Sequence, residues 1–349
     1  MIASQLITRS DYSQWDQYVS ESDQGGPYLT TAWKNAVESA YGHQAFYLAA
    51  RNGHNEIVGA LPLVRVRLPM ARGALVSMPY CDYGGLIADD AEAAEMLLGK
   101  AMELAGALKA GLEIRNPAHS DTIEAADGFC QVTDKCRMVL DLPESSAALW
   151  AGFKSKLRSQ VKRAGKEGLV ARLGQSEMIG DFYHVFSRNM RDIGSPVHSF
   201  QWLENILHAF GENARVGMVY RQKLPIGAGI ILMHGRTVTV PWASTVKEFN
   251  RFSPNMLLYW KFLEFAADGG YSSFDFGRST PGEGTYAFKR QWGASPVPLS
   301  WYRRCGNGNQ KNTDASAGQI RDAMEKLWQR LPLRAANTLG PHLRKYITR

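Results

Sequence analysis

The sequence has only four cysteines, and their spacing excludes the common zinc and disulfide-exchange motifs. Cys81, Cys130, Cys136 and Cys305 form no CxxC pair, and no cluster of cysteine and histidine accompanies them. Structural zinc sites need closely spaced ligand pairs, so no metal is expected here. Reduced thiols are the usual state in the cytoplasm, and we expect that state for this chain.

Long apolar runs are also missing. A helix that spans a bilayer needs about 20 consecutive apolar residues, and no run in the sequence approaches that length. The first twenty residues are polar and lack the apolar core of a signal peptide. Neither a phosphate-binding P-loop nor a Ser-His-Asp arrangement is recognisable. We expect a cytoplasmic protein, peripheral at the inner membrane at most, that needs no cofactor.

Positive charge is present, but it is concentrated in two segments. The 349 residues carry a formal net charge of +7. Between Leu149 and Arg172, seven basic residues stand against one acid, and between Ser316 and Arg349 seven stand against two. The rest of the chain is slightly acidic. An anionic partner is therefore expected to bind locally.

The most informative feature is an internal repeat. Alternating apolar residues around polar turns predict hairpins over 46–66 and 216–233. A strand that ends VSMP in the first copy and VTVP in the second follows each hairpin. An apolar-periodic helix and another strand come next. Pro79 and Glu113 are 34 positions apart, as are Pro241 and Asp275.

The order of hairpin, third strand, crossover helix and parallel fourth strand resembles the core of the GNAT acyltransferase fold. We therefore predict an α/β protein with mixed sheets and two tandem GNAT-like domains. The predicted domains are residues 1–146 and 169–305. A basic helical connector over 147–168 would join them, and a linker with an amphipathic basic tail would occupy 306–349.

Several motifs, taken together and in order, resemble the FemAB family, in particular its branch associated with exosortase (PEP-CTERM) protein-sorting systems. The resemblance covers nearly the whole chain. Its sharpest motifs are PYCDYGG (79–85), KSKLRSQVKRAGKEG (154–168), NMRDIGSPVHS (189–199), FDFGRST (274–280), YAFKRQWG (286–293) and LWQRLPL (327–333).

The resemblance implies a transferase without a metal or redox cofactor. Well-studied FemAB members pass an amino acid from aminoacyl-tRNA to an amine of a peptidoglycan precursor. GNAT enzymes that use acetyl-CoA usually hold its pyrophosphate on a glycine-rich loop at a helix N-terminus. The corresponding stretch here, 246–255, has no glycine, which lowers the expectation of acetyl-CoA.

Lys289 is the leading catalytic candidate. Acyl transfer builds negative charge on a carbonyl oxygen, and a fixed cation near that oxygen lowers the barrier. Lys289 matches the lysine of the family's FK motif. YAFKRQWG alternates with period two, so we expect a strand with Tyr286, Phe288 and Arg290 on one face and Lys289 on the other. An exposed strand lysine is the plain alternative.

Further candidates come from strand ends and turns. Asp275 and Arg278 end a predicted core strand, where Arg278 would clamp a phosphate or carboxylate; the alternative is a local ion pair. His198 is a candidate general base, although Gly194 and Pro196 make a simple helix cap and turn the stronger alternative. The remaining expected substrate-binding residues are Asp82 and Tyr83 (alternatively a tight turn), Tyr286 and Arg191.

The basic stretch has two readings of equal weight. Helical spacing places Arg158, Lys162 and Lys166 on one face, and Lys154 begins the stretch. A phosphate-binding stripe for tRNA or a nucleotide-linked precursor is one reading, and a solvated helix is the other. In the tail, Ile320, Leu327 and Trp328 would pack on the first domain or, less commonly, contact a membrane surface.

These features favour an enzyme that transfers an aminoacyl or acyl group to an amine on a cell-envelope, peptidoglycan or exopolysaccharide precursor. The expected partners are a phosphorylated, nucleotide-linked or lipid-linked precursor and tRNA. Two alternatives stay open. One is an N-acyltransferase that uses acyl-CoA or acyl carrier protein. The other is a non-catalytic binding or scaffold protein of an envelope or protein-sorting system.

Overall fold

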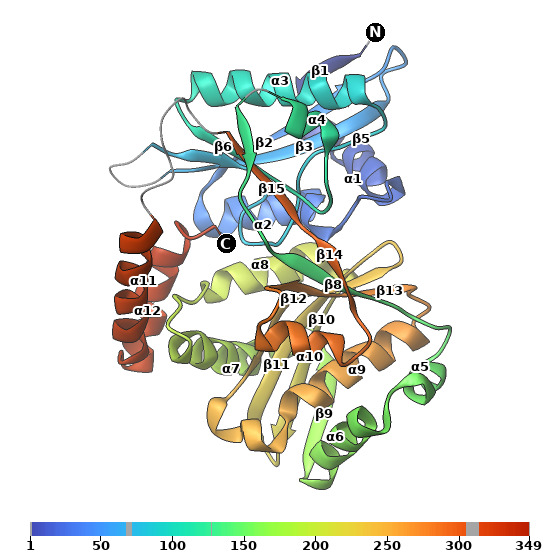
Figure 1. The fold of residues 1–349 in the computed structure, drawn as a ribbon, viewed down its shortest axis with the longest axis vertical. Coiled ribbons are helices and arrows are strands. Elements are labelled where there is room, and N and C mark those ends of the chain that lie inside the picture. Colours follow the sequence, from blue (N-terminus) through green and yellow to red (C-terminus); the bar gives the residue numbers. More distant parts are fainter. Residues whose placement is uncertain (1, 68–71, 127, 305–313, 349) are drawn as a thin grey trace. The chain divides into compact units, whose positions relative to one another are not determined.

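The computed structural model describes residues 2–67, 72–126, 128–304 and 314–348 (Figure 1). The chain divides into two compact units, each with its own sheet, which we call the first and second domains. The first comprises Met1–Cys136, Val297–Lys311 and Tyr346–Arg349, and the second comprises Arg137–Pro296 and Asn312–Lys345.

The first domain contains a mixed sheet in the order β1-β2-β3-β4-β6-β15-β7, with β5 paired to β3. Its core gathers apolar side chains of β2, β3 and β6 against helix α3, including Leu61, Leu97 and Ile114. The elements are β1 (Ala3–Leu6), α1 (Tyr12–Glu21), α2 (Thr31–Tyr41), β2 (Gln44–Arg51), β3 (Ile57–Val66), β4 (Ala74–Val76), β5 (Ile87–Ala88), α3 (Ala91–Ala107), β6 (Gly111–Asn116), α4 (Asp121–Ala125), β7 (Phe129–Gln131) and β15 (Ser300–Arg304), with 3-10 turns η1 (Arg9–Asp11) and η2 (Pro27–Leu29).

The second domain contains a sheet in the order β14-β8-β13-β12-β11-β10-β9. Its elements are β8 (Cys136–Asp141), α5 (Ser146–Gly152), α6 (Ser155–Lys166), β9 (Leu169–Gly174), η3 (Ser176–Met178), α7 (Ile179–Asp192), α8 (Phe200–Phe210), η4 (Gly211–Asn213), β10 (Ala214–Arg221), β11 (Leu224–His234), β12 (Thr237–Thr245), η5 (Lys247–Phe252), α9 (Pro254–Asp268), β13 (Ser273–Ser279), α10 (Gly284–Arg290), β14 (Ser295–Pro298), α11 (Asp314–Gln329) and α12 (Leu333–Arg344).

The predicted repeat is confirmed element by element. β2 pairs antiparallel with β3, and β10 pairs antiparallel with β11. The third strands β4 and β12 continue each sheet antiparallel, whereas β6 and β13 then pair parallel to them. Helices α3 and α9 are the crossovers that a parallel pair requires. Close packing of α9 explains Gly217 and Gly229 in the strands, since a Cβ at these positions would lie 2.3 and 2.8 Å from the Phe262 ring.

Each sheet contains one strand from the range predicted for the other domain. β8 falls within 1–146 but belongs to the second sheet, and β15 falls within 169–305 but belongs to the first. β15 pairs antiparallel with β6 and β7 of the first domain, and β8 lies beside β13 in the second. Trp301 and Tyr302 of β15 are each 1% exposed, so this strand contributes buried side chains to the first domain. Sequence reading missed the exchange because such partners lie far apart along the chain.

The connector is helical as predicted, but it belongs to the second domain. Helices α5 and α6 both pack on α9. The tail differs from the expectation of packing on the first domain. α11 and α12 contact α7 of the second domain, and Leu327 is 67% exposed. They pack closely at the α7–α8 turn, where Cβ atoms at Gly194 and Gly340 would contact Glu325 and Val197. The predicted linker 306–313 lies outside the described residues.

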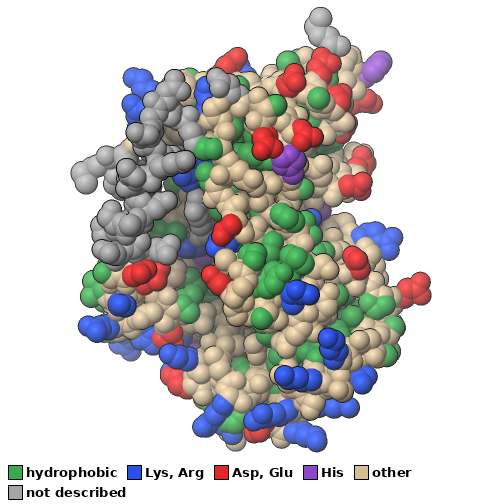
Figure 2. Space-filling model, in the orientation of Figure 1, with side chains coloured by type: hydrophobic (Ala, Val, Ile, Leu, Met, Phe, Trp, Pro, Cys, Tyr) green, Lys and Arg blue, Asp and Glu red, His purple; other side chains and the backbone are tan. Residues whose placement is uncertain are grey.

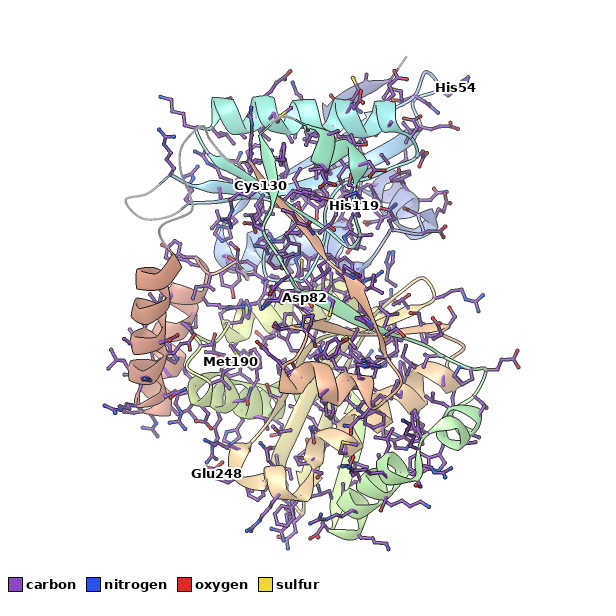
Figure 3. All side chains as sticks on the ribbon, viewed as in Figure 1. His54, Asp82, His119, Cys130, Met190 and Glu248 are labelled. Carbon is purple, nitrogen blue, oxygen red and sulfur yellow. The ribbon has the colours of Figure 1, made fainter. Side chains whose placement is uncertain are left out.

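The cysteines of the described residues differ in oxidation state. Cys81 and Cys136 are free and buried. Cys130, on β7 (Figure 3), is disulfide-bonded, which corrects the expectation of reduced thiols at that position. The pairing of β7 with β15 places Cys130 opposite Arg303, close to the end of β15. Cys305 follows that strand in the sequence and lies outside the described residues.

Candidate active site

A gap in the second sheet positions the candidate site. β12 and β13 pair in parallel only from Thr237–Thr239 with Ser273–Asp275. β12 then continues to Thr245, paired with β11 alone, and a register shift near Ile231 bends it. Bulges of this kind redirect strands and end pairing. The two parallel strands therefore part at the end of their common ladder.

A cleft of about 330 Å³ lies in the second domain beside this point. Four elements supply its walls: the end of α7, the half of β12 that β13 does not pair, the first turns of α9, and α10. Its lining residues are Asn189, Ala243, Ser244, Thr245, Asn255, Leu258, Tyr259, Gly284, Thr285, Phe288 and Lys289.

The segment that holds Lys289 is a helix, not the predicted strand. α10 spans Gly284–Arg290, and a helix places residues three and four apart on one face. Thr285, Phe288 and Lys289 consequently share the cleft wall, whereas a strand would put Phe288 and Lys289 on opposite faces. The seven residues 286–292 alternate with period two but also include good helix formers. Their sequence is therefore compatible with both a strand and a helix.

Lys289 is buried rather than exposed. The residue as a whole is 7% exposed. Nζ donates to the carbonyl oxygens of Gly277 at 3.0 Å and Arg278 at 2.8 Å. Both carbonyls belong to β13 beyond its pairing with β12, so the ammonium group binds β13 where the two parallel strands have parted. The positive charge is thereby fixed at the cleft wall.

Three polar residues from other elements line the same cleft. Asn189 Nδ2 on α7 donates to Ser244 Oγ on β12 at 3.1 Å. Ser244 is 6% exposed. Tyr259 of α9 stacks on Phe276 at 5.5 Å between ring centroids, and burial raises the pKa of its hydroxyl far above the ordinary value. The cleft thus combines a cation, an amide and hydroxyl groups with aromatic walls.

The start of α9 offers few donors to a phosphate. Pro254 occupies the first turn and has no N–H group. The N–H group of Met256 donates to the carbonyl of Ser253 at 3.0 Å, and that of Ser253 donates to Asn250 at 2.9 Å. The glycine-free stretch before the helix forms the 3-10 turn η5 in place of an open loop.

Other predicted residues of the second domain lie outside the cleft lining. Asp275 is fully buried; its Oδ1 accepts from the Gly277 N–H at 2.8 Å, and Oδ2 lies 3.6 Å from Arg137 NH1. These contacts match the alternative of a local ion pair. The Arg278 and Tyr286 side chains are half-buried, and Arg278 offers its carbonyl to Lys289.

His198 and Arg191 connect the core of the second domain to its C-terminal helices. His198 is 1% exposed, and its Nε2 accepts from Arg344 Nε at 3.0 Å. Burial, with the nearby Arg344 charge, holds the pKa of His198 well below its usual value. Arg191 pairs with Asp192 at 2.6 Å and donates to the Leu331 carbonyl at 3.3 Å. Neither residue lines the cleft.

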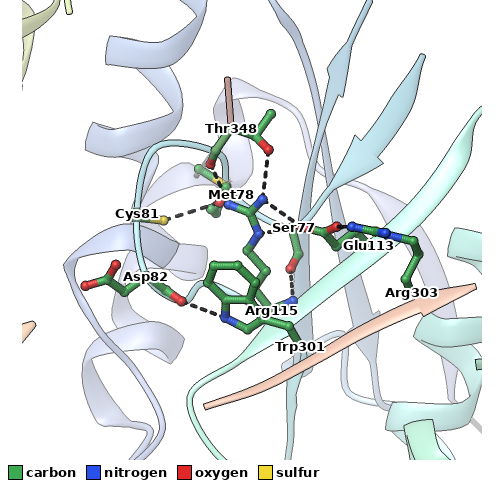
Figure 4. Close-up of polar contacts among 9 residues, drawn as sticks. All are labelled: Ser77, Met78, Cys81, Asp82, Glu113, Arg115, Trp301, Arg303 and Thr348. Carbon is green, nitrogen blue, oxygen red and sulfur yellow. Dashed lines mark hydrogen bonds and ion pairs between the residues drawn. The ribbon is translucent and has the colours of Figure 1, made fainter. Parts of the chain in front are cut away.

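The counterpart of the cleft in the first domain is filled. Tyr83 is 3% exposed and packs edge-on against Tyr28, with ring centroids 5.2 Å apart. The half-buried Asp82 accepts from Trp301 Nε1 through its backbone oxygen at 2.9 Å (Figure 4). A Cβ at Gly85 would lie 2.0 Å from Asn116 Oδ1, so this position requires glycine. The turn in this motif lies at Pro79 and Tyr80, ahead of the two glycines that were expected to set it.

Helix α6 forms a basic pocket of about 590 Å³ in the second domain. Trp150, Ser155, Arg158, Ser159, Lys162, Arg163 and Lys166 line it, whereas Lys154 does not. Lys162 Nζ lies 5.9 Å from the centroid of Trp150. The apolar face of α6, with Leu157 and Val161, is buried. Figure 2 shows Lys and Arg side chains gathered over this part of the second domain.

The described ranges contain neither a metal-binding cluster nor a membrane-spanning helix. Their side chains include no group of three or more His, Cys, Asp or Glu suited to a metal ion. None of their helices combines the length and apolarity that crossing a bilayer requires.

Comparisons with known proteins bear on the fold of the chain and on the family of its second domain. Residues 151–290 match the family described as the acetyltransferase (GNAT) domain. The solved structure of FemX has a TM-score of 0.69 at 18% identity, and the match covers 92% of this chain and 99% of that chain. A tandem GNAT protein from the clavulanic acid biosynthesis pathway has a TM-score of 0.54 at 11% identity, covering 88% and 100%. Both domains have the GNAT fold.

A third solved structure with a similar fold is that of L-PGS from Bacillus licheniformis, with a TM-score of 0.57 at 11% identity and coverage of 90% of this chain and 96% of that chain. A comparison with curated proteins found no match. The matched family segment spans the cleft and ends at Arg290, the last residue of α10.

Sequence reasoning missed several cleft residues. Ser244 stands three positions after Pro241, as Asp82 stands three positions after Pro79, so the repeat carried a signal for it. Asn189 lies inside NMRDIGSPVHS (189–199), one of the motifs that carry the family resemblance. No sequence signal marked Asn255, Tyr259 or Thr285.

Proposed function

We propose that the protein transfers an acyl group to an amine in the cleft of its second domain. The observation that carries this proposal is the buried Lys289 ammonium, held on two β13 carbonyls at the place where the parallel strands part. A cation fixed before the reaction needs no reorganisation when negative charge develops beside it.

The proposed chemistry is direct transfer between two bound substrates. The acceptor nitrogen attacks the carbonyl carbon of the donor ester or thioester, and the carbonyl electrons move to oxygen. Lys289 stabilises this oxyanion. The intermediate then expels the alcohol or thiol, and the proton lost by the amine leaves with that group. Asn189 and Ser244 orient the substrates from the opposite wall.

We propose an aminoacyl group carried by tRNA as the donor. Three observations support this choice: the fold likeness to FemX, the few free donors at the start of α9, and the basic pocket on α6. Arg158, Lys162 and Lys166 would bind RNA phosphates, and the Trp150 ring would receive a stacked base. The FemAB resemblance extends over the same residues.

For the acceptor we propose an amine on a peptidoglycan, exopolysaccharide or other envelope precursor. The choice extends beyond peptidoglycan because the sequence resembles the exosortase-associated branch of the FemAB family. A phosphorylated, nucleotide-linked or lipid-linked precursor would be met at the cytoplasmic side of the inner membrane. Contact of the basic tail with that membrane belongs to the same proposal.

A second candidate is an N-acyltransferase that uses acyl-CoA or acyl carrier protein. The specific observation in its favour is the family match, which is described as an acetyltransferase domain. A non-catalytic binding protein is the third candidate. The open cleft and the buried lysine of the second domain favour an enzyme over that alternative.

Transfer of label by the purified chain distinguishes the three. Labelled aminoacyl-tRNA and labelled acetyl-CoA are offered separately, with an extract of sugar-nucleotide and lipid-linked precursors as acceptors. We expect label from the tRNA to enter a precursor. Label that moves only from acetyl-CoA would reject the proposed donor, and no transfer from either would favour a binding protein.

A further inference from the structure

The first domain holds a second polar site at the point where its own parallel strands part. β4 and β6 pair over Ala74–Val76 with Gly111–Glu113, and the ladder ends with Ser77 N donating to the Glu113 carbonyl at 2.9 Å. The chain then leaves the sheet through Met78 and Tyr80, which have φ values of +58° and +69°. Left-handed backbone at non-glycine residues is strained and gathers at functional sites.

This site is occupied by the chain's own residues 346–348. The Thr348 carbonyl oxygen accepts from Tyr80 N at 3.0 Å and from Arg115 NH1 at 2.6 Å. Thr348 Oγ1 accepts from Arg115 NH2 at 2.8 Å. Figure 4 shows the guanidinium group reaching both oxygens. The Tyr80 N–H and Arg115 NH1 therefore both bind the Thr348 carbonyl oxygen, and Arg115 NH2 binds the Thr348 hydroxyl oxygen.

Arg115 is held rigidly for this task. It is fully buried, its Cζ lies 4.6 Å from the Trp301 centroid, and Nε and NH2 donate to Glu113 Oε1 at 2.9 and 2.7 Å. Arg303 NH2 donates to Glu113 Oε2 at 2.7 Å. Burial alone would raise the pKa of Glu113, but the two guanidinium groups bring it below its usual value. Two cations thus share one carboxylate.

The arrangement matches a carboxylate better than the peptide it holds. The two oxygens of a carboxylate, unlike a carbonyl and a hydroxyl, carry negative charge and suit the planar guanidinium fork. A cavity of about 220 Å³ adjoins the site, with apolar walls from Val66, Val76 and Leu112 and with Tyr346 at its rim. It offers room for a small side chain beside the carboxylate.

We propose that the first domain binds the carboxylate of a short peptide-like ligand through Arg115 and the Tyr80 N–H, and that Tyr346–Thr348 competes for this site. The ligand's carboxylate replaces the Thr348 carbonyl and hydroxyl oxygens. The proposal goes beyond acyl transfer in the second domain and does not depend on which donor the cleft uses.

Binding of a matched pair of probes tests it. N-acetyl-alanyl-alanine carries the carboxylate, and its C-terminal amide is the control. Calorimetry compares the full chain with a variant that ends after Lys345. We expect the truncated variant to bind the acid at least tenfold more tightly than the full chain does, and the amide at least tenfold more weakly than the acid.

A Thr348→Ala variant of the full chain keeps the test decisive if truncation prevents folding. It removes one accepting oxygen, so the acid should bind severalfold more tightly than to the unmodified chain. Arg115→Lys should abolish the preference for acid over amide. Equal binding of acid and amide to a folded truncated chain, or no binding by both the truncated and Thr348→Ala chains, would overturn the proposal. Neither result bears on transfer activity.

Discussion

At the scale of single residues, the place of a buried side chain separates the roles of charged and polar residues better than their type does. Lys289 and His198 were both candidates by chemistry. Lys289 lies at the cleft wall with its charge held by two carbonyls, whereas His198 lies in the core, stacked 5.7 Å from Trp202 between ring centroids. Sequence supplied the residue types, but which side chain faces a cleft depends on packing.

His198 leads to a prediction about stability and pH. Its pKa is depressed in the folded state, so below about pH 6.5, the ordinary value, the unfolded chain binds a proton that the folded chain does not. The free energy of unfolding should therefore fall with decreasing pH, by up to about 1.4 kcal/mol per unit, until the depressed pKa is reached.

Urea unfolding at pH 7.5 and 5.5 checks this prediction with two variants. His198→Gln should remove its share of the pH slope. His208→Gln, at an exposed position on α8, should keep the slope of the unmodified chain. Equal slopes in all three chains would show that His198 is not buried as a neutral base.

Asn189 and Ser244 are expected to act as a pair. Each single change to Ala should lower kcat/KM by about tenfold, because a lost hydrogen bond leaves the other group without its 3.1 Å partner. The double variant should be little worse than either single one, since contacting residues are not additive. Fully additive losses in steady-state kinetics would contradict a shared role.

At the scale of elements, the sequence predicted the hairpins, the crossover helices and the parallel strands, because the two copies reinforced each other. It failed at α10, where seven alternating residues fit two structures. It also failed to place α11 and α12, whose contact with α7 depends on close approach at Gly194 and Gly340. Local patterns specify an element more reliably than its docking partner.

Helix α6 carries a prediction of its own. Arg158 and Lys162 line the basic pocket, whereas Lys154 and Lys156 on the same stretch do not. Changing Arg158 and Lys162 together to Ala should weaken tRNA binding and reduce the slope of log affinity against log salt by about two.

The matched control changes Lys154 and Lys156 to Ala, which removes the same charge from outside the pocket. Filter binding over a range of salt concentrations separates the two pairs. The pocket would be excluded as an RNA site if both pairs weakened binding equally, because general charge would then explain the affinity.

At the scale of the whole molecule, duplication has produced two GNAT-fold domains with different contents at equivalent places. The second keeps an open cleft with Lys289 in its wall, while the first is filled by Tyr83 and the chain's own Thr348. The sequence repeat predicted two similar domains. It did not distinguish them, because Thr348 comes from the C-terminal segment, outside the repeat, and Tyr83 packs against Tyr28, which also lies outside it.

The central claim is that the second domain's cleft performs the transfer. The most direct measurement is the turnover of labelled aminoacyl-tRNA at saturating acceptor by Lys289→Ala, with Arg290→Ala as the control at the exposed neighbouring position. With folding verified by circular dichroism and thermal melting, the account predicts a loss of kcat of about 10²–10³-fold for Lys289→Ala and little change for Arg290→Ala. Full activity in a folded Lys289→Ala chain would contradict it.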